Sequence, residues 1–374
     1  MAGLYFHIPF CKQRCTYCDF HFTTNLSKVN EMIDAIIQEV ELRKKTIQSP
    51  IETIYFGGGT PSILDNALLS KLFTNLEKKI DLSSLQEVTL EANPDDLTRE
   101  KLRYLRSTPI NRLSIGVQSF FDNDLTFMHR AHKADEAENS IKMAQDFGFD
   151  NLTIDLIYGT PTTTDQQWTK NLNKAVDLQI PHISSYALTV EEKTILNHAI
   201  KSGKASDIDE EQQYRQFCIL QEFLTQRNYI QYEISNFGKE GFFAKHNTSY
   251  WQYKPYYGFG PSAHSYNGRC RQWNIANNQL YIKTIAQGKL PCETENLSEI
   301  DRYNEKLMIG LRTMWGIEIR EIKNLFARDI FHSFQKETSL LLAEGLLKEE
   351  EGFLRIPDEN KFYTDGITSR LFYV

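Results

Sequence analysis

The stretch YFHIPFCKQRCTYCDF, from Tyr5 to Phe20, places three cysteines in a CxxxCxxC spacing directly after an apolar, strand-like start. The chain has six cysteines in 374 residues. So few cysteines would cross-link little of a chain this long, and a tight group of them therefore indicates metal binding rather than a disulfide framework. Cys11, Cys15 and Cys18 are the candidate metal ligands. For the other three we expect packing or surface roles: Cys218, Cys270 and Cys292.

The three clustered thiolates leave one position open on a tetrahedral ion or on an iron–sulfur cubane. A distant cysteine, or His7 or His21 close by, would complete a closed structural site of the zinc type. In the alternative, the position stays open for a small molecule. The spacing by itself favours neither arrangement, so the flanking residues have to decide between them.

Composition and charge narrow the class of protein. The chain carries 42 Lys and Arg against 49 Asp and Glu, a net charge of −7, with 41% hydrophobic and 24% charged residues. This composition is typical of a globular protein, and the length suits two or three domains. An acidic chain lacks the basic face that binds nucleic acid, so we expect no nucleic-acid partner. No apolar run reaches the roughly 18 residues of a membrane span, and the start lacks a signal peptide. We therefore expect no transmembrane segment and a cytoplasmic protein.

Strand-like and helical patterns alternate about six times in the first half of the chain. The strand-like runs lie around Tyr5 and end at Phe56, Glu91, Val117, Ile157 and Leu188. The helical patterns between them cover residues 29–45, 66–79, 98–106, 134–147 and 164–178. In the first of these helices we expect the acidic residues to face outward. Apolar strands joined by helices predict an α/β fold with a parallel sheet, either doubly wound or curled towards a barrel.

The pattern changes after about residue 190. A charged helix is predicted over 209–226, and an aromatic stretch without a clear period follows at 246–266. Helical blocks at 299–313, 319–326 and 333–347 then lead into two strand-like pieces, FLRI and KFYT. Helices followed by a hairpin predict a small, mostly helical C-terminal domain of winged-helix type. The predicted units are residues 1–200, 201–295 and 296–374.

Polar groups follow the predicted strands one after another. Gly57 to Pro61, GGGTP, comes after the second strand, Glu91 ends the third, Gln118 ends the fourth, and Asp155 lies near the end of the fifth. Because the carboxyl ends of parallel strands meet at one edge, these groups should converge around one opening of the fold, which we call the mouth. Glycines there let the backbone approach a ligand closely.

The cysteine stretch, with Tyr17 just before the last cysteine, resembles the radical S-adenosylmethionine (SAM) superfamily. The resemblance implies a six-stranded partial (β/α) barrel, a [4Fe-4S] cluster on the three cysteines, SAM chelated to the open iron, and an electron donor such as flavodoxin or ferredoxin. It also implies that the glycine motif contacts the methionine end of SAM and that Arg130 binds its carboxylate. The SAM-binding residues implied are Tyr5, Tyr17, Gly58, Gly59, Thr60, Glu91, Gln118, Arg130 and Asp155.

The motifs HIPFC, GGGTP, LEANP, GVQSF, HRAH and DLIYGTP together resemble the oxygen-independent coproporphyrinogen III dehydrogenases and the related HemW-type heme chaperones. The dehydrogenases oxidatively decarboxylate propionates of the porphyrinogen ring. They carry a long N-terminal extension and a further cysteine two places after the third ligand. Here Cys11 follows only ten residues, and the further position is Phe20. Both differences favour the chaperone branch.

The chaperone branch has an HNxxYW motif, which matches His246, Asn247, Tyr250 and Trp251. Imidazole is a common axial ligand of heme iron, and aromatic side chains suit a flat macrocycle. The resemblance therefore implies that His246 binds heme, which is passed to an acceptor protein of unknown identity. For His264, a possible second contact, a structural role is the preferred interpretation.

Overall fold

Six strands in the first half of the chain pair in sequence order and run parallel. The computed structural model describes all residues from 1 to 374. The strands are β1 (Ala2–Ile8), β2 (Ile51–Gly58), β3 (Glu87–Ala92), β4 (Arg112–Gln118), β5 (Leu152–Tyr158) and β6 (His182–Ala187). Each is largely buried, as expected for parallel strands covered by helices. The predicted alternation of strands and helices is confirmed.

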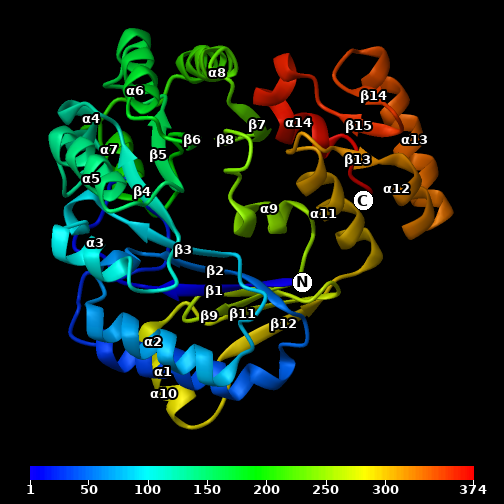
Figure 1. Ribbon diagram of the computed structural model, residues 1–374. Helices are drawn as coiled ribbons and strands as arrows, with labels where there is room; N and C mark the ends of the chain where they lie inside the picture. The colour runs from blue at the N-terminus through cyan, green and yellow to red at the C-terminus, as the bar shows by residue number, and fades with distance from the viewer.

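Helices connect these strands and cover the outer side of the curved sheet (Figure 1). They are α1 (Val29–Arg43), α2 (Asn66–Lys79), α3 (Arg99–Leu105), α4 (Asp122–Phe127), α5 (Ala134–Asp146) and α6 (Asp165–Asp177). Two further helices, α7 (Ile195–Lys201) and α8 (Glu210–Thr225), follow β6. Side chains just before α2, α3 and α6 cap their free backbone N–H groups: Asp65, Thr98 and Thr164. The apolar faces of α1, α2, α3, α5, α6 and α8 share one core of 54 buried residues with the strands, whereas Leu125 of α4 and Leu196 of α7 belong to a smaller cluster.

The sheet does not stop at six strands. It continues past β1 through β9 (Tyr256–Phe259), β10 (His264–Tyr266), β11 (Cys270–Asn274) and β12 (Cys292–Asn296), and past β6 through β8 (Asn236–Gly238) and β7 (Ile230–Glu233). The total is a mixed sheet of 12 strands, which corrects the expectation of a six-stranded barrel. β9 is parallel to β1. These added strands were missed because each has only three to five residues, too few to show a clear alternation, and because β9 and β10 lie in the aromatic stretch at 246–266.

A buried ion pair ties the added strands to α1. Glu39, which is fully buried, accepts hydrogen bonds from Arg43 at 2.8 Å, from Asn274 at 2.8 Å and from the Gly260 N–H at 2.9 Å. Tyr281, in α10 (Asn278–Ala286), donates to it at 2.5 Å. The prediction that the acidic residues of this helix all face outward is therefore wrong for Glu39.

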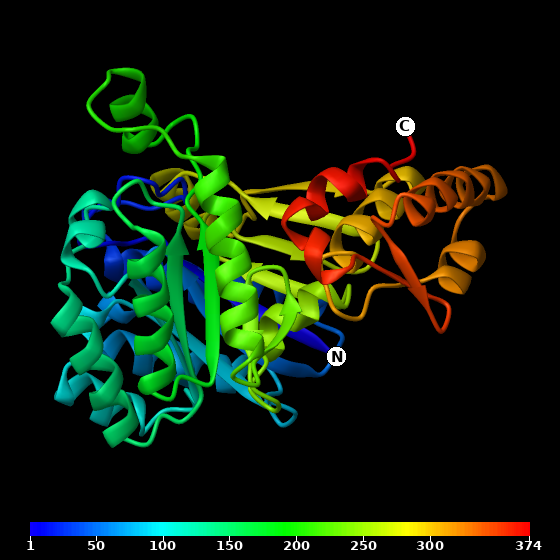
Figure 2. The ribbon, with the colours of Figure 1, turned by 90° about the horizontal axis from the view of Figure 1, so that it is seen from above.

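The C-terminal part has a second core of 13 buried residues between Tyr303 and Leu371. Its helices are α11 (Glu299–Gly310), α12 (Ile319–Leu325), α13 (Arg328–Ala343) and α14 (Thr364–Ser369). They pack with a three-stranded sheet of β13 (Ile317–Glu318), β15 (Phe353–Arg355) and β14 (Lys348–Glu350). FLRI is a strand as predicted, but KFYT lies mainly in a 3₁₀ helix over Asp358–Tyr363. Figure 2 shows this part beside the end of the large sheet.

No helix in the molecule combines the length and the apolar character that crossing a bilayer requires.

Candidate functional site

The three cysteines lie in the loop between β1 and α1, and backbone hydrogen bonds hold this loop in place. Cys11 N–H donates to Thr23 O at 3.1 Å, and Cys18 N–H donates to Cys15 O at 3.5 Å. Thr16 N–H donates to Met128 O at 3.1 Å, which fixes the loop against the segment after β4. The loop is thereby positioned over the carboxyl ends of the parallel strands, where binding sites of such folds lie.

Hydrogen-bond donors point at two of the three sulfurs. Thr60 Oγ1 donates to Cys11 Sγ at 3.4 Å, and Arg130 Nη1 donates to Cys15 Sγ at 3.3 Å. Burial raises the pKa of Cys11 and of Cys18 to about 11, so both are thiols until a metal displaces their protons. A cation and a hydroxyl beside the sulfurs stabilise the thiolate that a metal requires. The donor set therefore fits a thiolate-bound metal group.

The zinc alternative needs His7 or His21 as a further ligand. His7 has no free ring nitrogen, because Nδ1 is 3.1 Å from the Tyr5 hydroxyl and Nε2 is 2.8 Å from His21 O. His21 Nε2 is 2.7 Å from Asn278 Oδ1. This geometry favours the open arrangement over a closed site completed by a histidine.

The glycine motif forms a tight turn against the start of the cysteine loop. Gly58 has φ 108°, a conformation that favours glycine. A Cβ on Gly59 would lie 2.6 Å from Phe10 O, so a larger residue would push the two segments apart. Gly59 N–H donates to Ile8 O at 2.9 Å, and Thr60 N–H donates to Phe10 O at 2.7 Å. The motif thus brings Thr60 to Cys11.

Two carboxylates at the strand ends have raised pKa values. Burial raises the pKa of Glu91 to about 7, against the hydrogen bonds that it accepts from Tyr55 at 2.7 Å and the Gly58 N–H at 3.2 Å. Burial also raises the pKa of Asp155 to about 6, while Ser114 donates to it at 3.5 Å. Perturbed groups of this kind gather at functional sites.

Arg130 joins the cysteine loop to the strand ends. Its Nη1 lies 3.5 Å from the Tyr17 hydroxyl, and its Nη2 donates to Asn93 Oδ1 and Gly116 O, both at 2.8 Å. Its Nε is buried without a partner. Gln118 ends β4 with φ 67°, a strained conformation for a residue with a side chain. Arg130 therefore links Cys15 and Tyr17 of the cysteine loop to Asn93 and Gly116 at the ends of β3 and β4.

Sequence reasoning missed Asn93 and Tyr55. Asn93 accepts from Arg130 and donates to Thr60 Oγ1 at 3.3 Å, and so connects the third strand to the glycine motif. It directly follows β3, and a polar residue at a strand end was the available signal. Tyr55 lies inside an apolar strand run, where nothing marks its bond to Glu91.

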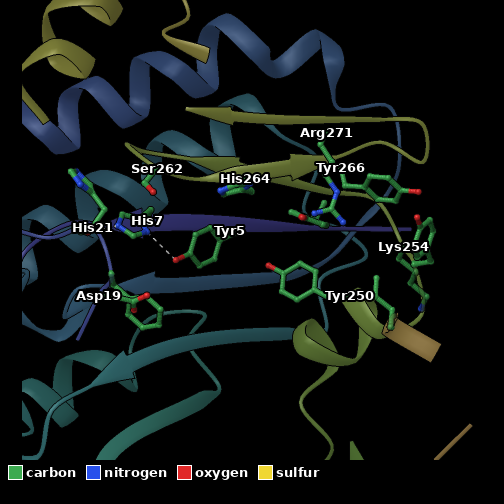
Figure 3. A pocket seen from close by; sticks show the side chains of 14 residues that line it. Tyr5, His7, Asp19, His21, Tyr250, Lys254, Ser262, His264, Tyr266 and Arg271 are labelled. Atoms are coloured by element: carbon green, nitrogen blue, oxygen red, sulfur yellow. Dashed lines mark hydrogen bonds between the residues drawn. The ribbon is translucent and has the colours of Figure 1, made fainter. Parts of the chain in front are cut away.

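A cavity of about 540 Å³ lies between the cysteine loop and the added strands (Figure 3). One wall comes from the loop and β1, another from α9 (Lys245–Trp251) and the strands β9 to β11, and Ile309 of α11 completes it. The lining is mainly aromatic, with basic groups among the rings: Tyr5, His7, Asp19, Phe20, His21, Tyr250, Tyr253, Lys254, Tyr256, Ser262, His264, Tyr266, Arg271 and Ile309.

His246 is not part of the cavity wall. Its side chain is 1% exposed, with Nδ1 2.7 Å from Thr53 Oγ1 and Nε2 2.7 Å from the Tyr250 hydroxyl. Its ring stacks on Tyr55 at 5.1 Å, and burial lowers its pKa to about 3. Both ring nitrogens are therefore occupied, and the expected heme ligation by His246 would require the Tyr250 bond to break.

The comparisons with known proteins agree with these motifs. A model of the radical SAM superfamily matches residues 5–175, and a model of the HemN C-terminal domain matches residues 297–362. "Heme chaperone HemW" of Bacillus subtilis is 34% identical over 365 residues, covering 96% of each chain. The protein of that name from Lactococcus lactis is 33% identical, over 95% of this chain and 93% of its own. The chain belongs to the HemW family of radical SAM proteins.

Among solved structures, this HemW-family chain is similar to coproporphyrinogen III oxidase (HemN) from Escherichia coli, with a TM-score of 0.85 and 22% identity. The match covers 99% of this chain and 90% of that one, and it shows a shared fold. Membership of the radical SAM superfamily implies a [4Fe-4S] cluster and SAM as cofactors. The remaining cysteines of the chain lie outside the loop: Cys218 is exposed, and Cys270 and Cys292 are half-buried.

Proposed function

We propose that this protein is a heme chaperone that binds heme in the aromatic cavity and transfers it to an acceptor protein. The observation that carries the proposal is the cavity itself, whose walls are tyrosines and Phe20 with Lys254 and Arg271 among them. Flat rings suit a macrocycle, and the two cations suit its propionate carboxylates. Relatives named heme chaperones, with 34% and 33% identity, support the same function.

We propose that Cys11, Cys15 and Cys18 hold a [4Fe-4S] cluster with exchangeable SAM. When bound, this pair supplies one-electron chemistry, with flavodoxin or ferredoxin as the electron donor. Arg130 keeps a positive charge beside Cys15 and Tyr17 and offers its guanidinium to the SAM carboxylate. Glu91, Gln118 and Asp155 offer acceptors to the ribose hydroxyls and the amino group. The glycine motif lets the backbone lie against the methionine end.

We propose that three consecutive parts of the chain have different roles. Residues 1–200 carry the cluster and SAM, residues 201–295 supply most of the aromatic cavity wall, and residues 296–374 form the C-terminal domain. In this division Phe20 has a specific role, because its side chain is 67% exposed and lines the cavity. An exposed phenyl ring next to the cysteine loop provides apolar contact for a tetrapyrrole. It stands where the dehydrogenases have their further cysteine, so this chain has no thiol at that position.

A heme titration of the reconstituted protein, followed by transfer to an apo-acceptor, tests the proposal. We expect one heme per chain with a shifted Soret band, and loss of that band when a heme-free acceptor is added. The competing activity is conversion of coproporphyrinogen III to protoporphyrinogen IX. Turnover by reduced protein with SAM, in the absence of heme binding, would contradict the chaperone function.

A further inference from the structure

Four histidines lie at or near the cavity, but three of them have hydrogen bonds to ring nitrogens. Both nitrogens of His7 and both of His246 are occupied, and Nε2 of His21 is bonded to Asn278. A heme ligand needs a free ring nitrogen that faces the heme. His7 and His246 therefore do not meet this requirement. His21 keeps only Nδ1 free, and among the four histidines His264 alone has both ring nitrogens without a partner in the protein.

His264 does meet it. Its side chain lies on β10, is exposed, and lines the cavity together with Ser262 and Arg271 (Figure 3). Neither ring nitrogen has a hydrogen-bond partner within the protein, while the ring stacks at 6.1 Å on Trp273 of the paired strand β11. Stacking fixes the ring plane and leaves the nitrogens available.

The surroundings of His264 suit an anionic, flat ligand. Tyr253 and Tyr266 pack edge to face at 5.0 Å, and Tyr250 packs on Tyr256 at 4.6 Å, so the wall opposite the cysteine loop is a continuous aromatic surface. Arg271 forms an ion pair with Glu305, with Nε 2.9 Å from Oε1, and no hydrogen bond within the protein occupies its outer nitrogens. Partial loss of solvent around the ring, followed by the charge of Arg271, lowers the pKa of His264, and neutral imidazole is the form that ligates iron.

We propose that His264 is the axial ligand of the heme iron, and that His246 is a positioning residue that holds the Tyr250 hydroxyl. This inference rests on the proposed heme-binding function. It assigns the two histidines different tasks: one contacts the iron, and the other supports the wall. The motifs of the sequence implied the opposite, with His246 as the heme ligand and His264 in a structural role.

Ferric heme titration of the full-length protein tests this assignment, with wild type, His264→Ala, His246→Ala and His332→Ala compared. His332 is exposed on α13 and serves as the matched control. For His264→Ala we expect at least tenfold weaker binding and loss of the histidine-ligation signature in electron paramagnetic resonance. For His246→Ala we expect that signature to persist. His264→Gly should regain it when free imidazole is added, and His264→Tyr should shift the Soret band.

The outcomes separate this inference from the function on which it rests. Heme binding by wild type with an unchanged signature in His264→Ala would overturn the assignment and leave the chaperone function standing. Loss of the signature in His246→Ala or in His21→Ala, with His264→Ala unaffected, would also overturn it. Absence of heme binding by wild type would overturn the proposed function itself. Circular dichroism of each variant checks that the fold is intact.

Discussion

Two regions of the molecule share strand β1: the mouth, formed by the cysteine loop and the strand ends, and the aromatic cavity. They differ in how far their polar groups are hydrogen-bonded within the protein. At the mouth, apart from Arg130 Nε, the donors and acceptors described above pair within the protein: Arg130 bonds Cys15 and Asn93, and Glu91 accepts from Tyr55. At the cavity, His264 has no hydrogen-bond partner in the protein. The mouth is thus held in shape by its own residues, whereas the cavity leaves His264 and the Tyr266 hydroxyl for an external partner.

Replacing a cluster cysteine should have the largest effect. Cys11→Ala, Cys15→Ala or Cys18→Ala should each abolish cluster assembly, because two thiolates cannot retain a cubane that is already open at one iron. Iron and sulfide content and visible absorbance after anaerobic reconstitution measure this. Cys218→Ala, at an exposed position, is the control and should retain the full cluster. About one zinc and no sulfide in the wild type would refute the cluster.

Removing Glu39 should destabilise the wall of the cavity. Glu39→Leu leaves Arg43 buried without its partner, and we expect a loss of about 3–5 kcal/mol in the free energy of unfolding. Urea denaturation measures the change. Glu31→Gln, at an exposed position of the same helix, should stay within about 0.5 kcal/mol of wild type. Equal losses in the two variants would show that the buried ion pair does not hold the added strands.

Replacing Arg130 tests whether SAM binding at the mouth depends on this side chain and its hydrogen bonds. Arg130→Ala removes charge-assisted hydrogen bonds of about 1.5–3 kcal/mol, so SAM affinity should fall roughly tenfold to a hundredfold. Equilibrium binding of SAM to the reconstituted protein measures this. Arg103→Ala, on the exposed face of α3, is the matched control and should bind SAM as wild type does. Unchanged affinity in Arg130→Ala would exclude the proposed contact.

A pH titration should show the smallest effect. The pKa of Glu91 is raised to about 7 and that of Asp155 to about 6, so both carboxylates are ionised at pH 8 and take up protons as the pH falls towards 6. Protonation removes acceptors from the mouth, and we expect SAM affinity to decrease severalfold over this interval. In Glu91→Gln the decrease should shift to lower pH. A flat profile in wild type would contradict a role for these carboxylates in binding SAM.

The cluster loop and the strand ends were predictable because their signals are local. Three cysteines within eight residues and a polar group at the end of each apolar strand can be read without knowing the tertiary structure. Glu39 shows where such reading fails. A carboxylate on an amphipathic helix is usually solvated, and only the approach of Asn274 and Tyr281, more than 200 residues later, makes a buried site for it.

His246 and His264 show the same difference between local signals and tertiary contacts. The superfamily, the CxxxCxxC motif, the parallel core of the sheet and an aromatic segment rich in tyrosine can all be recognised from the order of the residues alone. The folded chain, in contrast, packs His246 of α9 against Thr53 and Tyr55, and the pairing of β10 with β11 turns His264 to the cavity. The physical reason is that a free ring nitrogen depends on which distant groups come within hydrogen-bonding distance, and a local motif carries no information about them.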